Sequence, residues 1–262
     1  MDVLVVRFEA PMLSFGAPII DNRGVIQPYP AMSMMTGLLG NALGYDHSDF
    51  GLLESLQSRL KYASRQDRRG QKIEDYQTVS LGKPYMDDAR AWTTRDELEE
   101  RAGGSASSGT HIRRRDYWAD AAHTVAISLS GSDDAAAPTV RTLESALREP
   151  ERPLFVGRKT CLPAAPMALG TIRADGLVDA LRVAPLAREA EGIDEGNERF
   201  RAWWPSTKDG DGPEPDADMR EPVTDRRDWE NQIHVGQRWI ATGDITVDPN
   251  PDAFRTRPGG SA

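Results

Sequence analysis

The chain has 262 residues, of which 39% are hydrophobic and 28% are charged, and its formal net charge is −9. This composition is typical of a folded, water-soluble protein with enough residues for one large or two small domains, and it offers no apolar run near the roughly 18 residues of a membrane helix. A single cysteine, Cys161, excludes an internal disulfide and a multi-cysteine zinc site. The N-terminus lacks the pattern of a secretory signal, so we expect a cytoplasmic protein.

The first predicted elements are a strand, a loop and a helix. Residues 3–8 are rich in valine and predict a strand, and residues 11–18 form a loop. Ser33 is the expected N-cap of a helix whose apolar residues recur at helical spacing until Gly44.

Two glycines lie inside this helix, where each costs about 1 kcal/mol relative to alanine. Gly37 and Gly40 therefore indicate a close neighbour, which is either another part of the protein or a bound chain. We favour packing within the protein.

The middle of the chain predicts a helix at residues 50–60 and a basic strand at 62–69. Residues 74–79 are short and irregular. Residues 80–109 are polar and interrupted by glycine and proline, and they predict an exposed excursion with a flexible tip.

Four further elements follow. Residues 124–129 predict a strand, residues 138–148 a helix, and residues 154–156 a short buried strand. Residues 237–247 predict a last pair of strands.

This order favours an α+β protein with a ferredoxin-like domain over residues 1–169. A small β-rich region is expected at 170–248. Within it, residues 189–218 are predicted to be a flexible insertion, because they are too acidic and too rich in glycine and proline to pack. Residues 249–262 are predicted to be a disordered tail.

The negative charge is concentrated in one part of the sequence. Residues 189–218 hold ten acids and three bases, which gives −7 and leaves −2 for the rest of the chain. Basic residues gather elsewhere, at 59–72, 113–115, 158–159 and 226–227. A local basic patch, rather than the whole-chain charge, decides whether phosphate can bind.

Residues 153–163 carry the strongest local signal for such a site. Gly157 can adopt backbone angles that other residues avoid and lets another backbone come close. Arg158, Lys159 and the hydroxyl of Thr160 follow it directly. These groups together predict a binding site for a phosphate backbone. Cys161 is expected to be a buried small residue.

Residues 111–118 combine three arginines with two aromatic side chains. This combination supplies charge neutralisation and a surface for base stacking. Tyr117 and Trp118 could equally belong to the core, and His111 could contact RNA or lie in a solvated loop. None of the four histidines has the spacing of a metal site.

Six blocks of the sequence carry a family resemblance: residues 7–16, 30–44 (ending Thr-Gly-Leu-Leu-Gly-Asn-Ala-Leu-Gly), 75–79, 113–127, 153–163 and 225–229. In this order they resemble the CasD subunit family of the CRISPR-associated Cascade complex, type I-E-like, within the RAMP superfamily. The resemblance implies a ferredoxin-like (RNA-recognition-type) domain with a protruding β thumb near residues 80–116 and a small C-terminal β region.

The resemblance also implies a function. It implies a non-catalytic subunit, without metal or cofactor, that grips the five-prime handle of the CRISPR RNA. The expected partners are the repeated backbone subunit, whose filament this subunit caps, and the large subunit beside it. Target DNA is met only indirectly, through the complex, and no membrane is involved.

The family usually carries basic or Thr-Arg-Ser residues before the glycine-containing helix, where this chain has residues 31–36, Ala-Met-Ser-Met-Met-Thr. Phosphate contacts at the helix start would then come from Ser33, Thr36 and backbone amides. The full set assigned to RNA binding is Ser14, Phe15, Ser33, Thr36, His111, Arg113, Arg114, Arg115, Tyr117, Gly157, Arg158, Lys159 and Thr160.

Two other functions are open to the sequence. The first is a metal-independent endoribonuclease that processes CRISPR repeat RNA, for which His111 and Lys159 are the candidate pair. The second is a protein-interaction module that makes no direct RNA contact.

Overall fold

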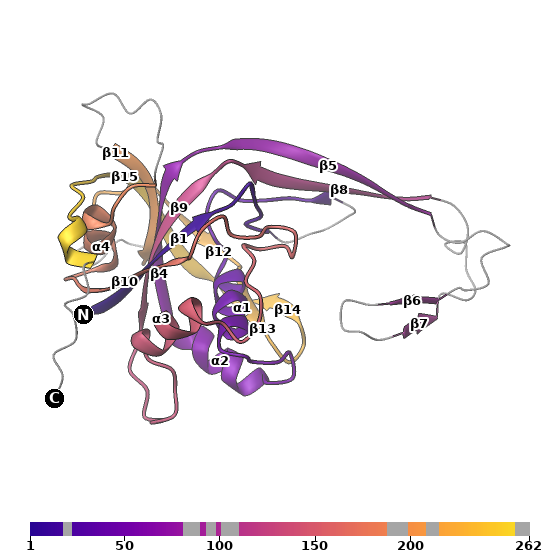
Figure 1. The fold of residues 1–262 in the computed structure, drawn as a ribbon, viewed down its shortest axis with the longest axis horizontal. Coiled ribbons are helices and arrows are strands. Elements are labelled where there is room, and N and C mark those ends of the chain that lie inside the picture. The colour runs from indigo at the N-terminus through magenta and orange to yellow at the C-terminus, as the bar shows by residue number, and fades with distance from the viewer. Residues whose placement is uncertain are drawn as a thin grey trace.

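A computed structural model describes residues 1–17, 23–80, 90–92, 98–100, 110–187, 199–207 and 215–254. The protein is of mixed α and β structure, built around one large antiparallel sheet with a long hairpin that projects from it (Figure 1).

The main sheet has seven strands in the order β10-β1-β9-β4-β11-β15-β12, and every neighbouring pair is antiparallel. The strands are β1 (Asp2–Glu9), β4 (Leu60–Arg68), β9 (Ala122–Leu129), β10 (Ala168–Arg173), β11 (Arg199–Ser206), β12 (Met219–Val223) and β15 (Arg238–Thr246). The strands predicted at 3–8, 62–69 and 124–129 are confirmed as β1, β4 and β9.

Helices cover both faces of this sheet. They are α1 (Met32–Ala42), α2 (Phe50–Arg59), α3 (Val140–Arg148) and α4 (Leu177–Val183), and the first three confirm predicted helices. Successive side chains of a strand point to opposite faces. Leu4, Val6 and Phe8 of β1 accordingly pack with α1 and α3, whereas Val3 and Val5 pack with α4. Burial on both sides explains why β1 is apolar along its whole length. None of the described helices is long and apolar enough to cross a lipid bilayer.

The prediction that residues 189–218 form one flexible insertion is wrong for residues 199–206. These residues form β11, which pairs with β4 on one side and β15 on the other. Ala202 and Trp204 are buried against the α4 side of the sheet. Residues 188–198 and 208–214 lie outside the described residues. The acidic flanks concealed a buried strand, and β11, β15 and β12 continue the main sheet rather than forming a region apart from it.

The projecting hairpin consists of β5 (Gln71–Ser80) and β8 (Thr110–Ala119), which pair over ten residues each. It extends well beyond the helices in Figure 1. The irregular segment predicted at 74–79 is therefore wrong, since it belongs to β5. Much of the predicted thumb, at 81–89, 93–97 and 101–109, lies outside the described residues. The base of β8 also pairs with two short strands, β2 (Met12–Leu13) and β3 (Arg23–Gly24).

Smaller elements complete the fold: β6 (Arg90–Trp92), β7 (Leu98–Glu100), β13 (Arg226–Asp228), β14 (Ile233–Val235) and the 3-10 helix η1 (Pro251–Phe254). The predicted strand at 154–156 is not formed, and the predicted strand pair at 237–247 is the single strand β15. In the predicted tail, Phe254 packs against the core beside α4, and residues 255–262 lie outside the described residues.

A buried ion pair fastens the end of α4 to the sheet. Arg65 of β4 lies 2.6 Å from Asp67, and both side chains are completely buried. The Arg65 guanidinium also donates to the carbonyl oxygens of Leu181, Ala184 and Pro185. Most of its N–H groups are thereby satisfied inside the protein, as a buried charge requires.

Candidate functional site

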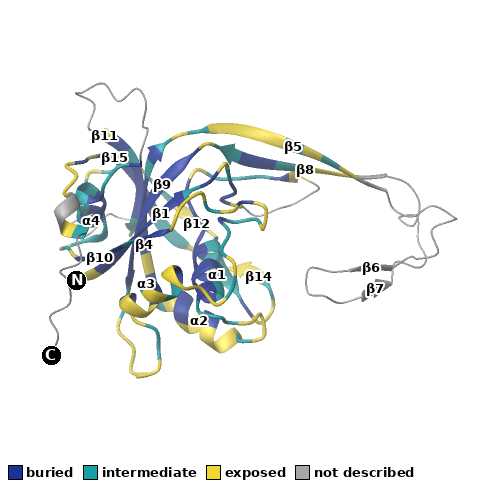
Figure 2. Ribbon diagram, in the orientation of Figure 1, coloured by how far each residue is buried: buried dark blue, intermediate teal, exposed yellow. Residues whose placement is uncertain are grey.

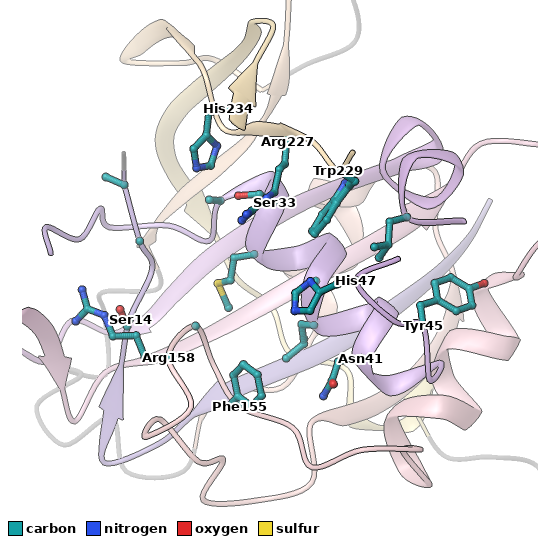
Figure 3. Close-up of a pocket in the computed structure, with 18 of the residues that line it drawn as sticks. Ser14, Ser33, Asn41, Tyr45, His47, Phe155, Arg158, Arg227, Trp229 and His234 are labelled. Atoms are coloured by element: carbon teal, nitrogen blue, oxygen red, sulfur yellow. The ribbon is translucent and has the colours of Figure 1, made fainter. Parts of the chain in front are cut away.

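A groove of about 500 Å³ follows one face of α1 (Figure 3). Its lining combines α1, the loop before Cys161, the segment after α1 and the β13–β14 hairpin; the polar and aromatic members are Ser14, Ser33, Asn41, Tyr45, Asp46, His47, Arg152, Phe155, Arg158, Arg227, Trp229 and His234. Three arginines and one aspartate line it, which gives a local charge of +2 in a chain of −9. We call it the α1 groove.

The two glycines of α1 serve different purposes in the structure. A Cβ on Gly40 would lie 2.7 Å from the side chain of Leu53, so this glycine lets α2 pack closely. A Cβ on Gly37 would meet only the Trp229 ring, at an ordinary 3.7 Å. Gly37 lines the groove, and the missing side chain keeps the floor of the groove low.

The start of α1 is capped by a residue far along the chain. The helix begins at Met32 with Ala31 as its N-cap, so the prediction of Ser33 as N-cap is wrong. The Met32 N–H donates to the Asp225 carboxylate at 2.8 Å, and the Ser33 N–H donates to the Asp225 carbonyl. A helix N-terminus favours an anion, and here a carboxylate of the protein fills that position. Ser33 itself lines the groove.

Arg238 holds this carboxylate in place. Its Nε and Nη2 donate to the two Asp225 oxygens at 2.8 and 2.7 Å. Its Nη2 also donates to the hydroxyl of Tyr62, which in turn donates to the Pro30 carbonyl just before the helix. The network joins β15, β4 and the start of α1. The backbone amides of Met32 and Ser33, which were expected to contact phosphate, therefore have acceptors within the protein.

The loop before Cys161 crosses the end of β2 at very short range. Gly157 has φ +95, and a Cβ on it would lie 1.8 Å from the Ser14 carbonyl oxygen. The Ser14 N–H donates to the Val156 carbonyl at 3.1 Å. The close backbone approach predicted for Gly157 is present, and it brings Ser14 into the groove lining.

Arg158 fastens this loop to the base of the hairpin. Its Nη1 donates to the Asp116 carbonyl at 2.8 Å and its Nη2 to the Gly24 carbonyl at 2.9 Å. Its guanidinium carbon lies 4.7 Å from the centre of the Tyr117 ring, within cation–π range. Arg158 thus has a structural role and also lines the groove.

The three residues after Arg158 divide between surface and core. Lys159 and Thr160 are exposed at the tip of the loop. Cys161 is buried, and burial raises the pKa of its thiol, the opposite of the lowering that two adjacent cations would produce. The prediction of a buried small residue is confirmed.

Strand alternation separates the three arginines of β8. Residues two apart share a face, and residues directly opposite in a pair share it too. Arg113 and Arg115 lie on the face of Tyr117 and Arg158, while Arg114 lies on the other face, opposite Tyr76 of β5. Arg113 and Arg114 are exposed and Arg115 is half-buried. His111 belongs to β8, but its side chain lies outside what the structure describes.

Three of the predicted contact residues are core residues, so these predictions are wrong. Phe15 is fully buried and meets the His123 ring edge-on at 4.9 Å between ring centres. Thr36 is fully buried, and its hydroxyl donates to the Met32 carbonyl one turn earlier. Tyr117 is 2% exposed beneath Arg158. None of the three presents a surface on which RNA could lie.

The groove also contains residues outside the set predicted to bind RNA. Arg152 donates to the Tyr45 carbonyl at 2.6 Å and pairs with Asp46 at 2.7 Å, which fixes it at one end. Arg227 comes from the β13–β14 hairpin and packs over Trp229. In the sequence, Arg152 is only a lone arginine beside a proline, and Arg227 is one member of the 225–229 block. Sequence alone could not bring them beside α1.

The exposed aromatic surface lies on β5 rather than β8. Tyr76 is 53% exposed, and the guanidinium carbon of Arg114 lies 5.7 Å from its ring centre. Within the described part of the chain, no three His, Cys, Asp or Glu side chains are grouped so that they could hold a metal ion. Arginines and an open aromatic ring suit the binding of a flexible polyanion with exposed bases.

Comparisons with known proteins agree with the family resemblance. A family model described as CRISPR-associated protein (Cas_Cas5) matches residues 3–241. The Cascade subunit CasD of the CRISPR system of Escherichia coli (strain K12) is 30% identical over 178 residues, which are 68% of this chain and 75% of that protein.

Two solved structures share the fold. A chain of a CRISPR RNA-guided surveillance complex superposes with a TM-score of 0.67 and 22% identity, covering 94% of this chain and 90% of the other. A chain from a crystal structure of a Cas protein gives a TM-score of 0.59 and 22% identity, with 95% and 99% covered.

Proposed function

The chain belongs to the CRISPR-associated Cas5 family, and from this premise we propose that it is an RNA-binding subunit of a Cascade complex that holds the five-prime handle of the CRISPR RNA. The observation that carries the proposal is the α1 groove, which has a charge of +2 although the chain as a whole is strongly acidic. Phosphate neutralisation supplies most of the affinity for a nucleic-acid backbone.

The hairpin extends the proposed surface beyond the groove. Arg158 lies between the two, since it lines the groove and contacts the base of β8. Arg113 and Arg115 continue along the same face. We propose that the RNA backbone follows these arginines, and that Tyr76 on the opposite face offers a stacking surface for a base.

We propose that the first part of the chain has the ferredoxin-like topology. The strands β1, β4, β9 and β10 occupy the order β10-β1-β9-β4, with α1 and α2 between the first two in sequence and α3 between the last two. This arrangement supports a βαββαβ unit to which the later strands are added.

We propose that the subunit is non-catalytic. Arginine remains protonated and is a poor base, and three arginines dominate the charge of the groove. The endoribonuclease alternative named His111, whose side chain lies outside the described residues, and Lys159, which is exposed at the loop tip. The groove itself offers His47 and His234 for the same role. Metal-independent cleavage of repeat RNA that disappears when both are changed to alanine would favour that alternative.

The proposed partners are the repeated backbone subunit, whose filament this subunit caps, and the adjacent large subunit. Target DNA is met through the assembled complex, and the cytoplasm is the proposed location. The match to the E. coli Cascade subunit supports this assignment.

Filling the α1 groove tests the proposal. Leucine at Gly37 has room for its Cβ and extends a side chain into the groove, and it also removes the helix cost of glycine. We expect Gly37→Leu to weaken binding of a CRISPR repeat RNA by about 1–3 kcal/mol, the range of one lost base contact, with an unfolding midpoint that is equal to or higher than that of the unaltered protein.

The matched control is Gly51→Leu on α2, where a Cβ meets nothing within 4 Å. Binding is measured by fluorescence anisotropy over a series of salt concentrations. Normal affinity for Gly37→Leu with an intact fold would show that the groove does not hold RNA. RNA binding that is absent from the unaltered protein and from its assembled complex would favour the protein-interaction module.

A further inference from the structure

The β13–β14 hairpin presents two chemically different faces. Arg227 and His234 are directly opposite each other in its register, and both line the α1 groove. Asp228 and Ile233 form the next pair, and their side chains point to the other face because neighbours in a strand alternate. Val235 lies on that second face with Ile233. One face of the hairpin therefore belongs to the α1 groove, and the other face points away from it.

A second hollow of about 360 Å³ lies behind the hairpin, against the start of α2. We call it the acidic hollow, and its lining residues are Phe50, Gly51, Glu54, Asp228, Trp229, Glu230 and Val235. Trp229 also lines the α1 groove, so this one side chain is the wall between the two sites. The hollow holds three acids and no base, the reverse of the groove. Arg226 lies on the same face of the hairpin, opposite Val235, but it is not part of the lining.

Apolar side chains around the acidic hollow are unusually exposed. Ile233 is 56% exposed, Phe50 37% and Val235 36%, and β14 is exposed along its length in Figure 2. Exposed apolar groups gathered on one surface and surrounded by polar residues are characteristic of interaction sites. Trp229 is 5% exposed, and its buried Nε1 has no hydrogen-bond partner. A buried donor in this state calls for an acceptor, and a docked partner is one source that fits a side chain lining both sites.

Charge decides which class of partner fits. A nucleic acid would bring phosphates against Glu54, Asp228 and Glu230, and like charges repel. Asp228 stays ionised, since hydrogen bonds from Asn231 lower the pKa of its carboxyl. A protein segment with a lysine or arginine beside an aliphatic side chain matches both the acids and the apolar floor.

We propose that the acidic hollow docks a neighbouring protein subunit through a segment that presents a lysine or arginine next to an aliphatic side chain. The hairpin then has RNA on one face and protein on the other, with Trp229 touching both sites. The proposal rests on the proposed function for the identity of the assembly, because the neighbour is a subunit of the same complex.

The test pairs two leucine substitutions that fill one site each. The full chain is co-expressed with the other subunits of its complex and with the CRISPR RNA, and the complex is isolated through a tag on a different subunit. Gly51→Leu fills the acidic hollow and should reduce incorporation of the chain about tenfold or more, while its RNA affinity in isolation stays normal. Gly37→Leu should act mainly on the other readout: the RNA affinity of the isolated chain should be weakened.

A charge reversal provides the second variant. Glu54→Lys with Glu230→Lys changes two exposed side chains. Because Glu54 accepts a hydrogen bond from Gln57 at 3.3 Å, the unfolding midpoint of this variant is measured alongside and should stay unchanged. Incorporation should fall about tenfold or more in the same assay. Restoration by one lysine- or arginine-to-glutamate change on a neighbouring subunit would identify the docking segment. Normal incorporation of both variants would overturn the proposal. Loss of RNA affinity in Gly51→Leu with an intact fold would also overturn it, since the hollow would then belong to the RNA site. Failure of Gly37→Leu alone to affect RNA would count against the proposed function and leave the docking proposal standing.

Discussion

Two basic stretches of the sequence use the same amino acid in opposite ways. In β4, Arg65 is fully buried and its guanidinium is occupied by Asp67 and by backbone carbonyls. In β8, Arg113 and Arg114 are exposed on a hairpin that projects from the protein. The number of arginines in a segment therefore does not reveal a binding surface. What distinguishes the two strands is burial: the protein encloses the Arg65 guanidinium and its partners, whereas Arg114 meets Glu74 and Tyr76 on an open surface.

The largest expected effect follows from the buried member of this comparison. Arg65→Met should lower the free energy of unfolding by about 3–5 kcal/mol, because it removes one partner of a buried ion pair and takes the guanidinium donor away from the carbonyls of Leu181 and Ala184. Arg113→Met in β8 is the matched control and should change stability by less than about 0.5 kcal/mol. Urea denaturation measures both. Equal small losses would mean that the two arginines are not used differently.

A smaller effect is the pH dependence of stability that comes from a buried histidine, His123. Burial lowers the pKa of His123 to about 4, against an opposing contribution from nearby Asp67. The unfolded chain, with a pKa near 6.5, then binds the proton more readily than the folded protein. Stability from this group is complete above pH 6.5 and is lost as the pH falls toward 4, by about 3 kcal/mol in all.

The measurement is the unfolding free energy at a series of pH values between 7 and 4. His123→Phe keeps an aromatic ring between Phe15 and Trp203 and removes the titrating group. Its stability should depend less on pH over this range than that of the unaltered protein. Parallel curves for the two proteins would show that His123 is not the group responsible.

The smallest expected effect belongs to the exposed arginines. If both contact phosphate, replacing Arg113 and Arg115 by alanine should reduce the slope of log affinity against log salt by about 1.4, since each contact contributes about 0.7 on single strands. Tyr76→Ala should leave the slope unchanged and weaken binding by about 1–3 kcal/mol if it loses a base stack. An unaltered slope in the arginine double variant would show that the hairpin does not contact RNA phosphates, and the α1 groove would then be the whole proposed RNA site.

The sequence was most informative where one face or both faces of an element are buried. The apolar spacing of residues 34–43 predicts α1, and the valine-rich residues 3–8 predict β1. It failed for β5, because both faces of a projecting hairpin are exposed and its residues show no apolar alternation. It failed for β11 for a different reason, since the acidic residues on both sides concealed a short run of buried aromatics.

The candidate site was predictable only where the physical reason is local. Gly157 needs a positive φ and a close backbone neighbour, and its sequence context suggested both. Arg152, Arg227 and His47 come from three separate segments, and no spacing in the sequence places them along one helix. Phe15 and Tyr117 could not be assigned, because an aromatic residue in a basic stretch suits a core as well as a surface.

The cap on α1 has a consequence for the timing of folding during synthesis. The first turn of this early helix is fixed by Asp225, which Arg238 orients from near the other end of the chain. One wall of the groove is likewise supplied by Arg227, Trp229 and His234. A ribosome that has made only α1 and the first strands has therefore released a helix with an open start and a groove with one side missing. Until Arg238 has emerged, a nascent chain therefore has neither the fixed helix start nor the complete groove of the finished protein.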